Sequence, residues 1–238
     1  MTECNQPPSE QQIDIRYVGF CDILGFSNKI LANFDGTLEV YKEFANLLLG
    51  VLPIKGVEIT MYSDAVLITG QSLARVAQAI QSLWFTALVN NLMVRGAITK
   101  GRYWEQRQGN NMLVASDALA RAVKIERNLG VPAVVIADDV EIPDEFWLAR
   151  FVHGPYLAPI LHFRERNIVN PFNVMWGTSA NDRATQLMAE SPEHRDKYLW
   201  FLSLYDAVKS NHELIPANVL ARLLREEKLK LIPPQASS

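Results

Sequence analysis

The pattern of apolar and polar positions is clearest near the N-terminus, where an apolar run ends in an acidic residue. Val18 and Phe20 lead into Asp22 and are typical of a β-strand. Gly25 then permits a tight turn, and Ser27 is placed to cap a short helix. The pattern therefore predicts a strand that ends at a carboxylate and turns through glycine into a helix.

A second acidic strand is predicted over residues 57–68. Because side chains alternate along a strand, Thr60, Tyr62 and Asp64 are expected on one face. An aspartate inside an apolar strand is costly to bury unless it is paired or binds a cation. Asp22 and Asp64 on neighbouring strands would make a two-metal site for phosphoryl transfer.

Helical spacing of apolar residues follows on either side of this strand. It predicts helices over 37–49, 71–90 and 117–128. Thr37 is the expected N-cap of the first of them. Further strands are expected near 94–100 and 131–137. Strands and helices that alternate in this way indicate an α+β fold of the ferredoxin-like kind.

The two ends of the chain differ from this middle part. Residues 1–13 are polar and are predicted to be a flexible N-terminal arm. Residues 14–140 would form the catalytic core, and 141–238 a C-terminal extension that completes the domain and a dimer. The extension is expected to be mostly helical, while its aromatic residues between 146 and 163 could lie on strands or in covering loops.

Composition narrows the class of protein. The 238 residues carry a formal net charge of −3 with both signs interspersed, so no general attraction to nucleic acid or membrane is expected. The two cysteines, Cys4 and Cys21, give no metal-binding spacing and no disulfide framework, which indicates a reducing compartment. Without a signal pattern or a membrane-length apolar run, the prediction is a soluble cytoplasmic protein.

Three segments resemble the signatures of class III nucleotide cyclases. Residues 20–27 are similar to the F-x-D-I-x-G-F-[ST] motif, and Ser63-Asp64 lies where those enzymes carry a second metal aspartate. Residues 95–102 look like their R-x-G-I-x-x-G segment. The resemblance covers residues 15–137, and in detail the chain looks most like the compact pyrimidine cyclases of bacterial Pycsar anti-phage systems.

This resemblance implies a class III cyclase fold with a helical C-terminal extension, and a lyase that cyclises a nucleoside triphosphate and releases pyrophosphate. Asp22 and Asp64, with the Ile23 carbonyl, would hold two Mg²⁺ or Mn²⁺ ions. Arg95 matches an arginine that contacts the triphosphate, although it could instead form a surface ion pair. The backbone of one turn would hold the β and γ phosphates; its residues are Leu24, Gly25, Phe26 and Ser27.

The family also places an asparagine and an arginine on the helix after Ala115 as transition-state stabilisers. Here those positions are Ala120 and Lys124, with Arg121 one residue beyond the first, so a cation is present and the asparagine is not. In the family this pair reaches across from the other subunit. The resemblance therefore implies a homodimer with two equivalent sites.

Base recognition is where the chain departs from purine cyclases. Thr60 falls where those enzymes place a lysine that reads adenine, and Tyr62 lies two residues further. A threonine and a tyrosine suit a smaller base, although Tyr62 could simply pack beneath a helix. UTP is the predicted substrate, giving cUMP as a second messenger for a separate effector in anti-phage defence. The alternatives are a cytidylate cyclase, a purine cyclase, and an inactive cyclase-like dimerisation module.

Overall fold

The computed structural model describes most of the chain. The described ranges are 13–51, 54–109, 111–173, 177–210 and 214–230. The expected N-terminal arm lies outside them except for Ile13, as does Cys4.

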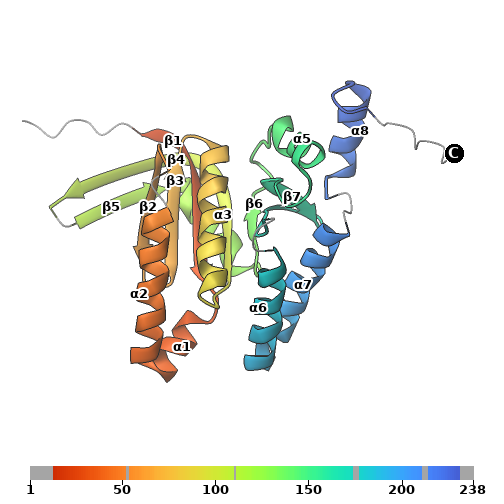
Figure 1. Cartoon of the computed structure of the whole chain (residues 1–238). Helices are drawn as coiled ribbons and strands as arrows, with labels where there is room; N and C mark the ends of the chain where they lie inside the picture. The colour runs from red at the N-terminus through yellow and green to blue at the C-terminus, as the bar shows by residue number, and fades with distance from the viewer. Residues whose placement is uncertain (1–12, 52–53, 110, 174–176, 211–213, 231–238) are drawn as a thin grey trace, which may run out of the picture.

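Within the described residues, eight strands form one mixed sheet (Figure 1). Their order is β2-β3-β1-β4-β6-β8-β7, and β5 pairs with β4 outside this path. β6 runs parallel to β4, whereas the other pairings are antiparallel. The strands are β1 (Asp14–Ile23), β2 (Val57–Tyr62), β3 (Ala65–Gly70), β4 (Val94–Gln108), β5 (Asn111–Ser116), β6 (Val134–Ile136), β7 (Ile160–Phe163) and β8 (Arg166–Val169).

Helices join and flank these strands. Those of the N-terminal half are α1 (Phe26–Ala32), α2 (Phe34–Val51), α3 (Leu73–Val89) and α4 (Asp117–Arg127). Those that follow β6 are α5 (Asp144–His153), α6 (Gly177–Glu190), the short 3₁₀ helix η1 (Pro192–His194), α7 (Arg195–Lys209) and α8 (Ala217–Arg225). No helix in the described ranges is long and apolar enough to span a bilayer.

α3 and α4 cover opposite faces of the sheet. A Cβ on Gly19 of β1 would lie 3.0 Å from Ile80 of α3, whereas the adjacent Val18 packs in one cluster with Ala118 of α4. Successive side chains of a strand point to opposite faces. Asp22, an even number of residues from Val18, therefore lies on the face that α4 covers.

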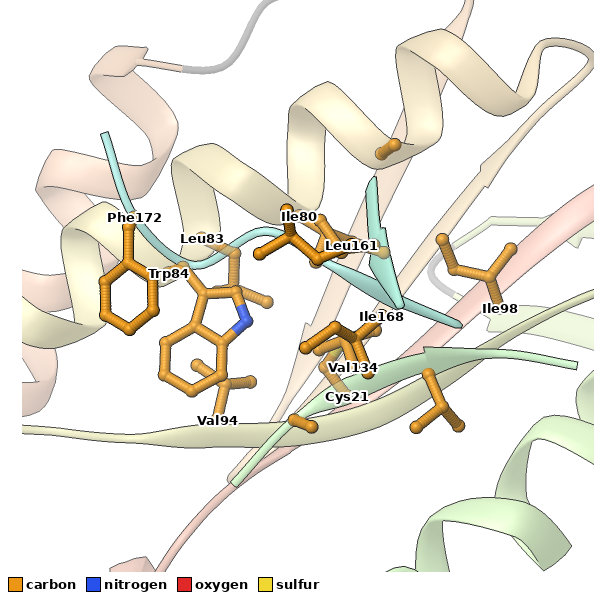
Figure 2. Close-up of a cluster of buried hydrophobic side chains, with 14 of the residues drawn as sticks. Cys21, Ile80, Leu83, Trp84, Val94, Ile98, Val134, Leu161, Ile168 and Phe172 are labelled. Carbon is orange, nitrogen blue, oxygen red and sulfur yellow. The ribbon is translucent and has the colours of Figure 1, made fainter. Parts of the chain in front are cut away.

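The apolar core continues from the N-terminal half into the extension. α3 is buried along most of its surface, as its nearly all-round apolar sequence predicts. Its Trp84 stacks on Phe201 of α7 with ring centroids 5.5 Å apart, and Phe172 packs on Phe201 at 5.1 Å. Figure 2 shows Trp84 and Phe172 beside each other in this cluster. The strands β7 and β8 join the same sheet, so the extension shares the core.

The structure confirms the α+β fold class and the helices expected over 71–90 and 117–128, which are α3 and α4. The single strand predicted over 57–68 is wrong. β2 and β3 are two antiparallel strands joined by the turn Ser63-Asp64, with φ of 55° at Ser63. Because the turn has only two residues, the alternating pattern of the sequence continues through it. The pattern therefore does not reveal that the chain reverses direction there.

Two predicted helix caps are also wrong. α1 begins at Phe26, with Gly25 at its N-cap and φ of 74° there, so Ser27 lies inside the helix. α2 begins at Phe34, and Asn33 rather than Thr37 accepts the bond from the Gly36 N–H at 3.1 Å. The expectation of strands or covering loops for the aromatic residues between 146 and 163 is wrong for Phe146, Trp147 and Phe151, which lie on the helix α5. Tyr156 lies in the following turn and Phe163 on β7.

Candidate active site

The two predicted metal aspartates meet at one end of the central strands. Asp22 is the penultimate residue of β1 and pairs in register with Ala65 of β3. The N–H of the next residue, Ile23, donates to the backbone carbonyl of Asp64 at 3.0 Å. Because β1 and β3 are neighbours, the turn that carries Asp64 lies directly beside the end of β1 that carries Asp22.

Ser27 orients the second aspartate. Its Oγ donates to Asp64 Oδ2 at 3.0 Å. The positive φ at Gly25 reverses the chain after β1 and brings the first turn of α1 to the β2–β3 turn. The residue expected to cap α1 thus holds a site carboxylate instead, and Gly25 at the N-cap has no side chain to offer the first amides of α1.

Arg95 faces Asp22 from the neighbouring strand. The two residues are register partners on β4 and β1. Arg95 Nε donates to Asp22 Oδ2 at 3.2 Å, and Nη2 lies 3.1 Å from the same oxygen. Arg95 is thus part of the carboxylate site in this structure. Arg95 does form an ion pair, but the pair is partly buried and its partner is a site aspartate, and contact with a triphosphate stays a prediction.

Glu126 of α4 is a site residue that the sequence analysis did not identify. Its Oε1 lies 2.5 Å from Arg95 Nε, an ion-pair contact without hydrogen-bond geometry, because that N–H points to Asp22. Glu126 is 4% exposed. It continues the buried stripe of Ala118 and Ala122, and an acid within such an apolar stripe was the available signal.

The electrostatic balance at Asp22 is unfavourable to its charge. Burial raises the pKa of Asp22 to about 6; Arg95 opposes this rise, and the charges of Glu126 and Asp64 add to it. Two carboxylates, Asp22 and Glu126, therefore contact one guanidinium, and a third, Asp64, adds its charge nearby. An excess of negative charge in a partly buried site is relieved by a proton or by a cation.

Asp22 and Asp64 fit a divalent ion of the magnesium type. No cluster of three or more acidic, histidine or cysteine ligands occurs in the described part of the chain. Mg²⁺ does not need one, since it commonly binds one or two carboxylates together with substrate phosphates. A dedicated all-protein cage is thus absent from the described ranges, and a pair of carboxylates that binds metal with a polyphosphate fits the donors.

Arg121 and Lys124 do not meet these carboxylates within one chain. Arg121 donates to the Lys100 carbonyl and pairs with Asp139. Lys100 lies five residues along β4 from Arg95, about 17 Å at the rise of a strand. Lys124 lines a cavity of about 590 Å³ between α4 and the end of β6. It is two residues from Glu126, about 200° around the helix.

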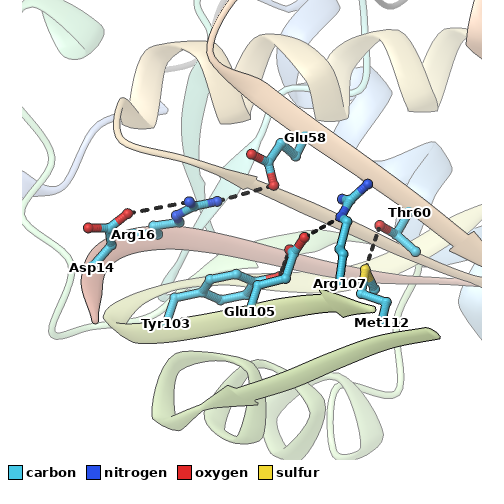
Figure 3. A network of polar contacts seen from close by, with 8 residues as sticks. All are labelled: Asp14, Arg16, Glu58, Thr60, Tyr103, Glu105, Arg107 and Met112. Atoms are coloured by element: carbon cyan, nitrogen blue, oxygen red, sulfur yellow. Dashed lines mark hydrogen bonds and ion pairs between the residues drawn. The ribbon is translucent and has the colours of Figure 1, made fainter. Parts of the chain in front are cut away.

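Thr60 and Tyr62 lie on β2, on the same face of the sheet as Asp22. Thr60 pairs in register with Leu67, which packs in the cluster beneath α4. Its Oγ1 lies 3.9 Å from Met112 Sδ of β5 (Figure 3). Tyr62 is 82% exposed, so the interpretation that it packs beneath a helix is wrong.

Known proteins were compared with the chain by sequence and by structure. No protein-family model and no curated protein matches it. A class III adenylyl cyclase-like ATP-binding protein from Pseudomonas aeruginosa superposes with a TM-score of 0.50 at 9% identity, over 75% of this chain and 42% of that one. The adenylyl cyclase CyaB from Pseudomonas aeruginosa gives 0.46 at 14% identity, over 67% and 94%. The guanylyl cyclase Cya2 gives 0.44 at 12% identity, over 53% and 76%.

The first of these similarities shows the fold. The chain spans less than half of that protein, and it has the α+β fold of a class III cyclase-like domain. The expected fold class is confirmed on this basis. This similarity of fold does not establish an activity, a substrate or a partner.

Proposed function

We propose that this chain is a nucleotide cyclase. The observation that carries the proposal is the meeting of Asp22 and Asp64 at one end of the central strands, in a fold shared with a class III cyclase-like protein. In the reaction the ribose 3′-oxygen of a nucleoside triphosphate bonds to the α-phosphorus. The bond from that phosphorus to the β-phosphate bridging oxygen breaks, the hydroxyl proton passes to water, and pyrophosphate leaves.

The residues of the site would divide this work. Asp22 and Asp64, with the Ile23 carbonyl, hold two Mg²⁺ or Mn²⁺ ions, which when bound favour the ionised 3′-hydroxyl and neutralise the triphosphate. Arg95 reaches the triphosphate from its position at Asp22. Ser27 fixes Asp64 by its hydrogen bond. The backbone of the turn approaches the outer phosphates; its residues are Leu24, Gly25, Phe26 and Ser27. Positioning and electrostatic stabilisation provide most of the acceleration in such reactions.

The proposed substrate is a pyrimidine nucleotide, UTP before CTP. Two features support it: the resemblance to the Pycsar pyrimidine cyclases, and a threonine at position 60 that lies on the face of Asp22 against Met112. The product, cUMP, would then be a second messenger in anti-phage defence, received by a separate effector. A purine substrate is the second candidate, because the protein of TM-score 0.50 is named for ATP binding.

The active unit would be a homodimer. Arg121 and Lys124 lie on parts of α4 that do not face the carboxylates of their own chain. As transition-state residues they would act on the site of the partner subunit, and each dimer would then have two equivalent sites. A cyclase-like dimerisation module without activity would have no chemical need for the paired aspartates.

The test is incubation of the protein with Mn²⁺ and each of ATP, GTP, CTP and UTP in turn. Mass spectrometry would detect the cyclic monophosphates, and Asp64→Ala is the matched inactive variant. Cyclic UMP from UTP, lost in the variant, is the expected result. A purine product would retain the cyclase proposal and overturn the pyrimidine one. No product from any nucleotide in the dimeric protein would overturn the cyclase proposal.

A further inference from the structure

The guanidinium of Arg95 contacts two carboxylates from different elements. Its Nε and Nη2 lie 3.2 and 3.1 Å from Asp22 Oδ2, at the end of β1. The same Nε lies 2.5 Å from Glu126 Oε1 of α4. A single cation therefore serves two acids, and one of these acids is a proposed metal ligand.

Glu126 depends on this cation more than Asp22 does. The Glu126 side chain is 5% exposed, against 22% for Asp22, so water solvates it least. Its Oε1 has no hydrogen-bond partner within the described residues. A carboxylate withdrawn from water is costly without a cationic partner, and Arg95 is the cation in contact with it.

A divalent ion at Asp22 would compete directly with Arg95. The ion would bind the same carboxylate, whose Oδ2 Arg95 contacts, and would repel the guanidinium a few ångströms away. Without another anion, Arg95 would be expelled from the site when the metal enters. Glu126 of α4 offers that second anion, at a contact with Arg95 Nε that already exists.

We propose, on the basis of the function proposed above, that Glu126 is a positioning residue. It holds the Arg95 guanidinium beside the site when a divalent cation takes over Asp22. Arg95 thereby exchanges a carboxylate of β1 for a phosphate oxygen of the incoming nucleotide while it stays anchored to α4. Glu126 itself touches neither metal nor substrate; it acts through Arg95.

Glu126→Gln tests this role without turnover. Binding of Mn²⁺ is measured by electron paramagnetic resonance of the free ion, and binding of inorganic tripolyphosphate to the Mn²⁺-saturated protein by calorimetry. With no second anion to hold it, Arg95 has to be displaced entirely when the metal enters, so Mn²⁺ affinity should fall by about tenfold. Tripolyphosphate affinity should fall as well, because the guanidinium is no longer held toward the phosphates.

A double-mutant cycle separates positioning from a merely structural effect. Arg95→Gln should tighten Mn²⁺ binding, since the competing cation is gone, and weaken tripolyphosphate binding. In that background Glu126→Gln should change Mn²⁺ affinity by only about twofold, because its effect through Arg95 has been removed. Equal losses in both backgrounds would show that Glu126 acts on the fold and not through Arg95.

Two further variants keep the test decisive. Asp144→Asn removes a carboxylate from another ion pair, with Arg222 and Lys228, and should leave both affinities unchanged. If Glu126→Gln does not fold, Glu126→Asp replaces it: the charge remains but retracts from Arg95, so tripolyphosphate affinity should fall in a folded protein.

The outcomes distinguish this inference from the proposed function. Wild-type affinities in Glu126→Gln and Glu126→Asp, or a wild-type protein that binds no Mn²⁺, would overturn the inference. A protein that shows the expected pattern of binding but cyclises none of the four nucleotides would overturn the proposed function and leave the role of Glu126 standing.

Discussion

The carboxylate of Asp22 lies at the end of a strand, beneath α4 and beside two other acids. A site that binds a divalent ion needs this concentration of negative charge. In the metal-free protein Arg95 is the cation that contacts Asp22 and Glu126 within the described residues, and Ser27 donates to Asp64. The residue that would do the chemistry is therefore one that opposes folding. Such opposition is common where binding requires uncompensated charge.

Asp22→Asn should therefore stabilise the protein while it abolishes metal-dependent activity. The folded-state pKa of about 6 is above the usual value of an unfolded aspartate, so the folded form holds the proton more tightly. Stability then falls as the pH rises from about 4 to about 6 and stays lowered above that. At neutral pH the free energy of unfolding of the variant, measured by urea titration, should be about 1–3 kcal/mol higher than that of the wild type.

The gain in Asp22→Asn should shrink toward zero near pH 4, where the native carboxyl is already protonated. Circular dichroism during urea titration at the two pH values provides this control. A variant less stable than wild type at neutral pH would contradict the electrostatic account of Asp22. Retained cyclase activity in the same variant would contradict its assignment as a metal ligand.

At the scale of elements, the pairing of β1 with β4 explains the glycine that follows Arg95, Gly96. A Cβ on Gly96 would lie 2.4 Å from the Phe20 carbonyl oxygen and 2.9 Å from the Cα and Sγ of Cys21. Backbone atoms cannot yield as a flexible side chain can. Gly96 therefore permits the close approach of strands that sets Arg95 opposite Asp22.

Gly96→Ala should separate β1 from β4 at the site. We expect the free energy of unfolding to fall by about 2 kcal/mol or more, as for overpacking in a dense core. The free energy of Mn²⁺ binding should weaken by more than this loss of stability. Gly19→Ala is the matched control, because its Cβ would meet the end of the Ile80 side chain, which can move. Equal effects of the two substitutions would contradict this explanation.

The turn between β2 and β3 places Asp64, and its backbone is strained at Ser63. Ser63 has a φ of 55° at the first central position of a two-residue hairpin turn. A position with such a φ is usually occupied by glycine. Ser63→Val should cost about 1–2 kcal/mol, because a β-branched side chain resists this conformation. Ser63→Gly should be within about 0.5 kcal/mol of wild type. Denaturant unfolding measures the stability of both variants. Similar stabilities of Ser63→Val and Ser63→Gly would contradict the strain at Ser63.

At the scale of the whole molecule, α4 points its residues to two places. Glu126 faces the site of its own chain, while Arg121 and Lys124 face the other side and the cavity near β6. One helix would thus serve two sites if a second copy lies against this face. The orientation of Arg121 and Lys124 agrees with a site shared between two subunits, and it does not fit a role in the carboxylate site of their own chain.

Trans-complementation tests the shared site. Asp64→Ala and Lys124→Ala should each be nearly inactive alone, since each dimer would lack one part of both sites. After mixing and exchange of subunits, mixed dimers would contain one intact site, so activity should return to about a quarter of wild type. Mixing two samples of the same variant is the control. No recovery between chains shown to exchange would contradict the dimer proposal.

The sequence by itself determined the local features of this protein. The apolar strand into Asp22, the all-round apolar α3 and the amphipathic α4 follow from periodicity, because each depends on near neighbours. Asp22 was visible because an acid at the end of an apolar strand is rare. Asp64 was identified by the resemblance to the cyclase signatures, since it proved to lie in a turn and not within an apolar strand. The turn at Ser63 and the caps of α1 and α2 were missed, since alternation and several capping residues fit more than one local structure.

Tertiary structure alone decided which of these residues meet. Antiparallel pairing of β1 with β3 and β4 puts Asp64 beside Ile23 and Arg95 beside Asp22, and the packing of α4 adds Glu126. Asp22, Asp64, Arg95 and Glu126 are 31 to 104 positions apart, so no local pattern relates them. Burial also turned Asp22 and Glu126 into groups that need a cation, because the cost of a charge depends on the water around it.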